Sequence, residues 1–89
     1  MAKVEVKMAL DPFKAVRGAL RHIKKPPSLG KIISIDYDEE ADVLYVKFKH
    51  SKTVDNKPLD NEGLMLASMD ERNEVTGLTI MEASRFAAR

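Results

Sequence analysis

Two short segments in which apolar and polar residues alternate, joined by an acidic turn, constrain this chain more than any other feature. In residues 33–38 and 43–49 the apolar side chains recur at every second position, which is typical of β-strands. Residues 38–42 between them are rich in aspartate and glutamate, and the aspartates favour turns. The sequence therefore predicts an antiparallel hairpin over residues 33–49.

Two further alternating segments, residues 64–69 and 75–81, complete the predicted sheet. Residues 70–74 form the turn between them, with Asn73 the best candidate for a left-handed backbone conformation. The polar stretch 50–63 is predicted to be irregular, apart from an edge extension near Thr53 and Val54. If consecutive strands are neighbours, the result is a four-stranded antiparallel β-meander.

The first 31 residues predict a strand followed by a helix. Residues 3–10 alternate, so they read as a strand with one apolar face. Asp11 is a good N-cap and Pro12 suits the first helical position, while the Pro26-Pro27 pair ends the helix, which spans residues 12–25. Its apolar stripe consists of residues at helical spacing: Phe13, Val16, Leu20 and Ile23. The predicted fold class is therefore α+β: the meander, an N-terminal strand and one amphipathic helix packed on the sheet.

A chain of 89 residues is expected to form one globular unit. Within it we distinguish a basic extension (residues 1–31), the sheet domain (32–84) and a tail (85–89). The predicted sheet is apolar on one face and half apolar on the other, and one short helix covers only part of it. The second face therefore needs the N-terminal strand, the tail or another subunit to cover it. Of these we favour a homodimer or a protein partner, the alternative being a solvated, semi-polar face.

Two motifs carry a family resemblance. YDEEADVLYV over residues 37–46 and NEVTGLTIMEAS over residues 73–84 resemble the domain-of-unknown-function family numbered twenty-two eighty-three. The resemblance covers residues 32–84, with Asn73 and Thr79 replacing residues that are common in the family. It implies a compact, mainly antiparallel sheet and no known active site. Some members look like the smaller partner of a toxin–antitoxin pair, so a toxin-like protein is one partner that the resemblance implies.

The residues of these motifs have structural interpretations. Asp38 and Asp42 can accept hydrogen bonds from backbone N–H groups of the turn. Gly77, in the middle of a strand, indicates a bulge or the close approach of a neighbouring side chain such as Tyr37 or Tyr45.

No combination of side chains indicates catalysis. The acidic cluster in residues 36–42 begins like a calcium loop, but Ala41 replaces the required glycine and the distal glutamate is missing. His22 and His50 have no second ligand at metal spacing, there is no cysteine, and the serines lie outside nucleophile motifs. We therefore expect no enzyme activity, no cofactor and no specific metal site, and both histidines at the surface.

Positive charge is concentrated in the N-terminal third. Residues 1–31 carry a net charge of +6, whereas residues 32–89 carry −5. Within the predicted helix, five basic residues fall within about 100° of arc; this basic stripe comprises Lys14, Arg17, Arg21, Lys24 and Lys25. Such a stripe can follow a phosphate backbone, although a charge run more often marks a solvated helix face.

The cellular setting is predicted from what the chain lacks. No apolar run approaches the roughly 20 residues that span a bilayer, and the alternating N-terminus does not resemble a signal peptide. The absence of cysteine fits a reducing compartment. We therefore predict a cytoplasmic, non-enzymatic interaction module that forms a homodimer or binds a protein partner, with nucleic-acid binding by the helix over residues 12–25 as the alternative.

Overall fold

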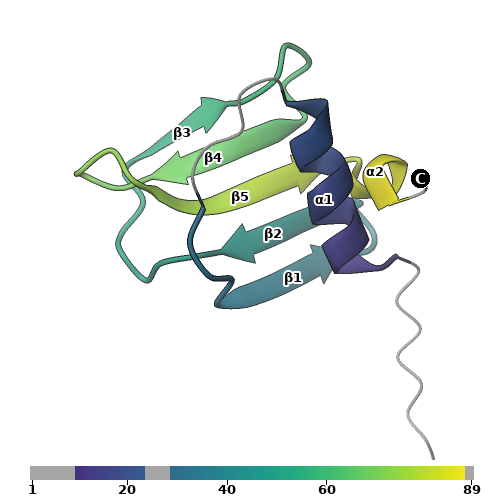
Figure 1. Cartoon of the computed structure of the whole chain (residues 1–89), viewed down its shortest axis with the longest axis horizontal. Coiled ribbons are helices and arrows are strands. Elements are labelled where there is room, and N and C mark those ends of the chain that lie inside the picture. Colours follow the sequence, from purple (N-terminus) through teal and green to yellow (C-terminus); the bar gives the residue numbers. More distant parts are fainter. Residues whose placement is uncertain (1–9, 24–28, 88–89) are drawn as a thin grey trace, which may run out of the picture.

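A five-stranded antiparallel sheet with a helix lying across one face forms the main body of the chain (Figure 1). The computed structural model describes residues 10–23 and 29–87. The elements follow one another along the chain as α1 (Pro12–His22), β1 (Ser34–Asp38), β2 (Val43–Lys47), β3 (Asp55–Pro58), β4 (Met65–Met69), β5 (Val75–Met81) and α2 (Ala83–Ala87). The predicted α+β class and antiparallel sheet are thus confirmed.

The order of the strands differs from the predicted meander. It is β1-β2-β5-β4-β3, with every neighbouring pair antiparallel. The chain therefore leaves β2, crosses to the far edge of the sheet and returns through β4 to place β5 beside β2. β5 is the longest strand and has buried residues on both of its faces, so it suits the centre of the sheet.

The far edge strand, β3, was predicted only as an edge extension near Thr53 and Val54, because its own sequence, DNKP, is polar. All four of its residues are exposed. Backbone pairing to β4 holds it, extended by hydrogen bonds from the Val54 N–H to the Met69 carbonyl (2.8 Å) and from the Leu59 N–H to the Met65 carbonyl (2.8 Å). A short, charged strand that ends in proline is typical of a sheet edge, where it discourages pairing with other chains.

The hydrophobic core lies between the helices and the sheet face that they cover. Alternate residues of the central strands point into it: Leu44, Val46, Met65, Ala67, Leu78 and Ile80. From α1 and its C-cap, Ala15, Val16, Ala19 and Ile23 fill the opposite side. None of the helices in the described part of the chain is long and apolar enough to cross a bilayer.

The buried side of α1 overlaps the predicted apolar stripe but does not include Phe13, and Leu20 is half-buried against the core. Val16 and Ile23 are buried as expected, but Phe13 is 57% exposed, so its assignment to the core was wrong. Ala15 and Ala19 take its place, both with 0% exposure. These small side chains let the helix backbone lie close to its neighbours, which a phenylalanine at that position would prevent.

The start of α1 is confirmed. The Asp11 carboxylate accepts hydrogen bonds from the backbone N–H groups of Phe13 (3.0 Å) and Lys14 (3.4 Å), and Pro12 is the first helical residue. The helix ends at His22, and the rest of the predicted helix lies outside the described residues apart from Ile23, its C-cap. Residues 3–9 of the predicted N-terminal strand also lie outside them, and Leu10 is buried without belonging to a strand.

Gly77 and Asn73 occupy the special backbone positions that the sequence predicted. A Cβ atom at Gly77 would lie 2.6 Å from the Val46 carbonyl oxygen, so a neighbour does approach closely, but it is backbone rather than a tyrosine ring. The sheet register shifts beside it, between Ser68 and Met69, as in a β-bulge. Asn73 has φ +65°, the left-handed conformation expected of it.

The last helix, α2, includes three residues of the segment 85–89 that the sequence analysis describes as a tail. α2 packs beside α1, with Ala83 and Phe86 in the core. The closest approach is at Gly18, where a Cβ atom would lie 2.2 Å from the Phe86 carbonyl oxygen. A glycine inside a helix weakens it, but here Gly18 permits the contact between the two helices.

Replacing Gly18 with alanine should destabilise the fold. The substitution favours an isolated helix by about 1 kcal/mol. Here, however, the new methyl group must displace the backbone of α2, and overpacking of this kind typically costs about 1–3 kcal/mol. We expect the midpoint of urea unfolding to fall. Gly30→Ala is the control, because nothing lies within 4 Å of a Cβ atom at that position. Equal stability of Gly18→Ala and wild type would contradict this interpretation.

Candidate functional site

The Asp42 carboxylate connects the two segments that carry the family motifs, residues 37–46 and 73–84. It accepts hydrogen bonds from the Tyr37 hydroxyl (2.6 Å), the Ser84 hydroxyl (2.6 Å) and the Ser84 backbone N–H (3.0 Å). Its own carbonyl accepts from the Ala83 N–H at 3.0 Å. Tyr37 and Asp42 come from the first motif, whereas Ala83 and Ser84 end the second. The motif residues therefore meet in one polar cluster at the start of α2.

These hydrogen bonds shift the pKa values of both Asp42 and Tyr37. Desolvation raises the pKa of Asp42, but the hydrogen bonds from the Ser84 side chain, Tyr37 and the Ser84 backbone together outweigh it, so the pKa is lowered. The hydrogen bond to Asp42, helped by desolvation, raises the pKa of Tyr37 to about 12. Asp42 is therefore held ionised and Tyr37 protonated, which is the arrangement that keeps their hydrogen bond intact.

The Asp42 cluster has a structural role in this geometry. The carboxylate accepts from the Ser84 N–H and the Asp42 carbonyl accepts from the Ala83 N–H, so Asp42 caps the start of α2. Asp42 has φ +56°, a conformation that asparagine and aspartate tolerate better than most residues. Asp38 accepts a hydrogen bond from the Ala41 N–H (3.2 Å), as predicted, whereas the sequence did not predict that Asp42 accepts from α2.

A second carboxylate, Asp70, is buried at the turn between β4 and β5. It accepts hydrogen bonds from the backbone N–H groups of Arg72 (2.9 Å) and Glu74 (2.9 Å) and from the Lys49 ammonium (3.1 Å). The hydrogen bond from Glu74 and the contact with Lys49 outweigh desolvation and lower the pKa of Asp70. These bonds join both ends of the turn to one carboxylate, so the cluster stabilises the turn.

The basic stripe is displayed on α1 as far as the structure describes it. Lys14, Arg17 and Arg21 are all exposed, and their spacing places them on one side of the helix. Lys24 and Lys25 lie outside the described residues. Phe13, expected in the core, is exposed four residues before Arg17, so an aromatic ring borders the stripe.

The sheet face turned away from α1, which we call the open face, displays the residues that alternate with the core residues along each strand. Its centre is a patch of Val43, Tyr45, Leu66, Thr79 and Met81. The register pairs Tyr45 with Thr79, Val43 with Met81 and Leu66 with Thr79, so these side chains are neighbours. Tyr45 is 47% exposed, and the others are partly buried or exposed.

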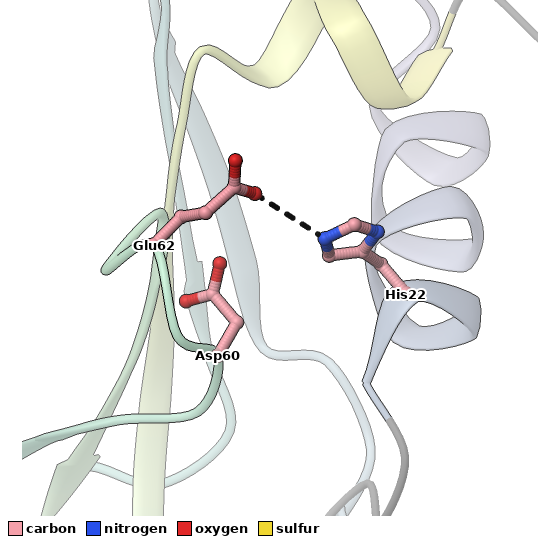
Figure 2. A group of neighbouring side chains, drawn as sticks. All are labelled: His22, Asp60 and Glu62. Carbon is pink, nitrogen blue, oxygen red and sulfur yellow. Dashed lines mark ion pairs between the residues drawn. The ribbon is translucent and has the colours of Figure 1, made fainter.

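Three side chains able to bind a metal converge between α1 and the turn that precedes β4 (Figure 2). His22, Asp60 and Glu62 have ligand atoms that all lie within 4.8 Å of one another. His22 is a surface residue, as predicted, but spacing along the chain gave no sign of its carboxylate neighbours, because they are about forty residues away. No other such group of three is present in the described ranges, so the acidic residues 36–42 do not converge in this way.

Removing the Tyr37 hydroxyl should weaken the fold in a pH-dependent way. We expect Tyr37→Phe to lower the free energy of unfolding by about 1–2 kcal/mol at neutral pH, because Asp42 loses a donor. The pKa of Tyr37 in the folded protein is raised above its value of about 10 in the unfolded chain. The stabilisation is therefore fully present below pH ~10 and is lost as pH rises toward 12.

Urea unfolding between pH 7 and pH 12 measures this effect. The difference between wild type and Tyr37→Phe should shrink across the upper two pH units. Ser84→Ala is the control, because it removes a hydroxyl donor to Asp42 that does not titrate in this range, and it should show no such trend. A constant difference at all pH values would refute the linkage.

The comparisons with known proteins agree with the motifs. A family model described as "Protein of unknown function (DUF2283)" matches residues 34–84, more than half of the chain. Comparisons with curated proteins and with solved structures found no match. The match spans the whole sheet and the Asp42 cluster, and it leaves α1 outside. The chain therefore belongs to the DUF2283 family.

Proposed function

We propose that this protein is a non-enzymatic interaction module that pairs with a second copy of itself through the open face. The observation that carries the proposal is the uneven covering of the sheet. α1 lies over one face in Figure 1, and α2 packs beside α1. The patch at the centre of the other face has no helix over it in the described part of the chain, although it contains Tyr45 and Met81.

The composition of the patch suits a protein interface. Tyrosine and methionine are enriched in such interfaces, and tyrosine contributes a large contact area with few rotatable bonds. The patch spans β2, β5 and β4, the three central strands, so its backbone is rigid. A flat, rigid, partly apolar face can associate without reordering a loop, which reduces the entropic cost of binding.

The charges around the patch favour a second copy as the occupant. Asp36 and Asp38 lie opposite Tyr45 and Val43 in the register, so they share the open face on its β1 side. Lys47 shares the same face at the other end of β2. A two-fold axis running across the strands would bring Lys47 of each copy toward the acidic pair of the other. Such self-complementarity is what a symmetric dimer requires.

Charge introduced at the centre of the open face should abolish pairing. We expect wild type to sediment as a dimer at micromolar concentration and Tyr45→Glu/Met81→Glu to sediment as a monomer, because the interface would bury two unpaired carboxylates per copy. Phe13→Glu is the matched control. It places the same charge on an exposed apolar side chain of α1 and should remain dimeric.

A wild-type monomer across the micromolar range would refute self-pairing. The toxin-like partner that the family resemblance implies would use the same face, so capture of such a protein by a monomeric wild type, and its loss in Tyr45→Glu/Met81→Glu, would assign the face to that partner instead.

Nucleic-acid binding by α1 is a second candidate. The observation that favours it is the exposure of Lys14, Arg17 and Arg21 along one side of a helix in the segment of net charge +6. Three cations in a row can follow a phosphate backbone and release its counterions. Phe13 beside them adds an apolar surface that can contact a sugar or base.

This candidate makes a prediction about salt. Three phosphate contacts imply that log K falls with log[salt] with a slope of about −2.7 for duplex DNA. Arg17→Glu/Arg21→Glu should abolish a gel shift seen at low salt, whereas Lys52→Glu/Arg72→Glu should retain it. The control makes the same change in charge at exposed positions outside α1. If wild type shows no shift at low salt, α1 does not bind nucleic acid.

A further inference from the structure

We propose that His22, Asp60 and Glu62 bind a first-row divalent cation of the Zn²⁺ class. This site is independent of the open face and of the basic stripe, and it lies where the C-terminal end of α1 meets the turn between β3 and β4. Figure 2 shows the imidazole and the two carboxylates directed toward a common space from the two elements.

The separation of the histidine and the glutamate suits two ligands of one ion. The His22 Nε2 atom lies 3.5 Å from the Glu62 Oε1 atom. This distance is long for a hydrogen bond between the two groups, which would normally be 2.7–3.2 Å. In a tetrahedral site with bonds of about 2.0–2.1 Å, neighbouring ligand atoms lie about 3.4 Å apart. The two side chains are therefore already placed along one edge of such a tetrahedron.

The aspartate is held in place by the backbone of the turn. Its two oxygens accept hydrogen bonds from the N–H groups of Met65 (3.0 Å, to Oδ1) and Leu64 (3.3 Å, to Oδ2). Each carboxylate oxygen has a further lone pair available for a cation. Hydrogen bonds of this kind orient the carboxylates that bind metals in proteins. Asp60 therefore supplies a ligand whose orientation is already determined.

The histidine ring is positioned from its other side. It packs edge-on against Phe86, with ring centroids 5.6 Å apart and an interplanar angle of 63°. Phe86 is buried, so this contact limits the rotation of the imidazole while leaving Nε2 directed toward Glu62. The side chains of His22 and Glu62 remain 45% and 53% exposed, so they can close by the small distance that coordination needs and water can complete the shell.

The chemistry of the donors selects the class of cation. One imidazole nitrogen and two carboxylate oxygens form a borderline set, which suits Zn²⁺ and its neighbours better than Mg²⁺ or Ca²⁺, since these prefer oxygen ligands only. Charge favours the same conclusion. The His22 imidazole must be neutral to bind a metal, so it would not balance the charge of the two carboxylates. Within the described ranges neither carboxylate has an ion-pair partner other than His22. A divalent cation would neutralise them.

Zn²⁺ bound here would connect α1 to the hairpin of β3 and β4. His22 lies outside the family match of residues 34–84, whereas Asp60 and Glu62 lie inside it. The cation would therefore fasten the basic N-terminal segment to the sheet that the family shares.

Calorimetric titration of the tag-free, full-length chain with ZnCl₂ tests the proposal. We expect one Zn²⁺ per chain and at least about tenfold weaker binding in His22→Gln and in Glu62→Gln. The matched controls are His50→Gln and Glu71→Gln, which remove an exposed histidine and an exposed glutamate elsewhere and should bind as wild type does. Circular dichroism verifies that each variant is folded.

Two further readouts separate a defined site from loose surface binding. Saturating Zn²⁺ should raise the melting temperature of wild type and of the controls but not of His22→Gln, because the ion joins two elements only in the folded state. Co²⁺ should give visible absorption bands of a nitrogen–oxygen site in wild type that are lost in His22→Gln. Absence of saturable Zn²⁺ binding, or equal affinity in wild type, His22→Gln and Glu62→Gln, would overturn the proposal.

Discussion

The hydrogen bonds of the Asp42 carboxylate are the interaction on which the rest of the structure depends. They tie the first hairpin to Ser84 and so determine where α2 begins. α2 then presents Phe86, whose carbonyl lies against Gly18 and whose ring lies against His22. The position of α1, with its basic stripe and its histidine, therefore follows from a contact made at the opposite end of the sequence. Two short motifs, far apart in the sequence, thus meet in one hydrogen-bonded cluster that positions both helices.

The sheet divides the molecule into two surfaces that differ in how they are covered. One is closed, because α1 packs on it through small residues and α2 packs beside α1. The other displays the patch around Tyr45, bordered by acidic residues on β1 and by Lys47. Successive side chains of a strand point to opposite faces of the sheet. The residues between the core positions therefore determine what the second face displays. We propose that this second surface is the one through which the protein associates.

The N-terminal helix adds properties that the family match does not include. It carries the exposed cations and contributes His22 to the group that contains Asp60 and Glu62. These two features lie on the helix side of the molecule, away from the open face, so a partner on one surface need not exclude a ligand on the other. The proposed cation site would also join the helix to the hairpin of β3 and β4.

Local sequence determined much of this protein because its signals act over a few residues. Alternation specified four strands, Asp11 and Pro12 specified the start of α1, and Asn73 specified a left-handed turn. What only the tertiary structure decided depends on contacts between distant segments. The strand order rests on β5 lying beside β2, the exposure of Phe13 rests on how closely α1 approaches its neighbours, and the Asp42 cluster joins residues that are 42 positions apart. The meeting of His22 with Asp60 and Glu62 is of the same kind. Hydrophobic periodicity determines which side of an element is buried but not which other element covers it, because that choice depends on the packing of the whole chain.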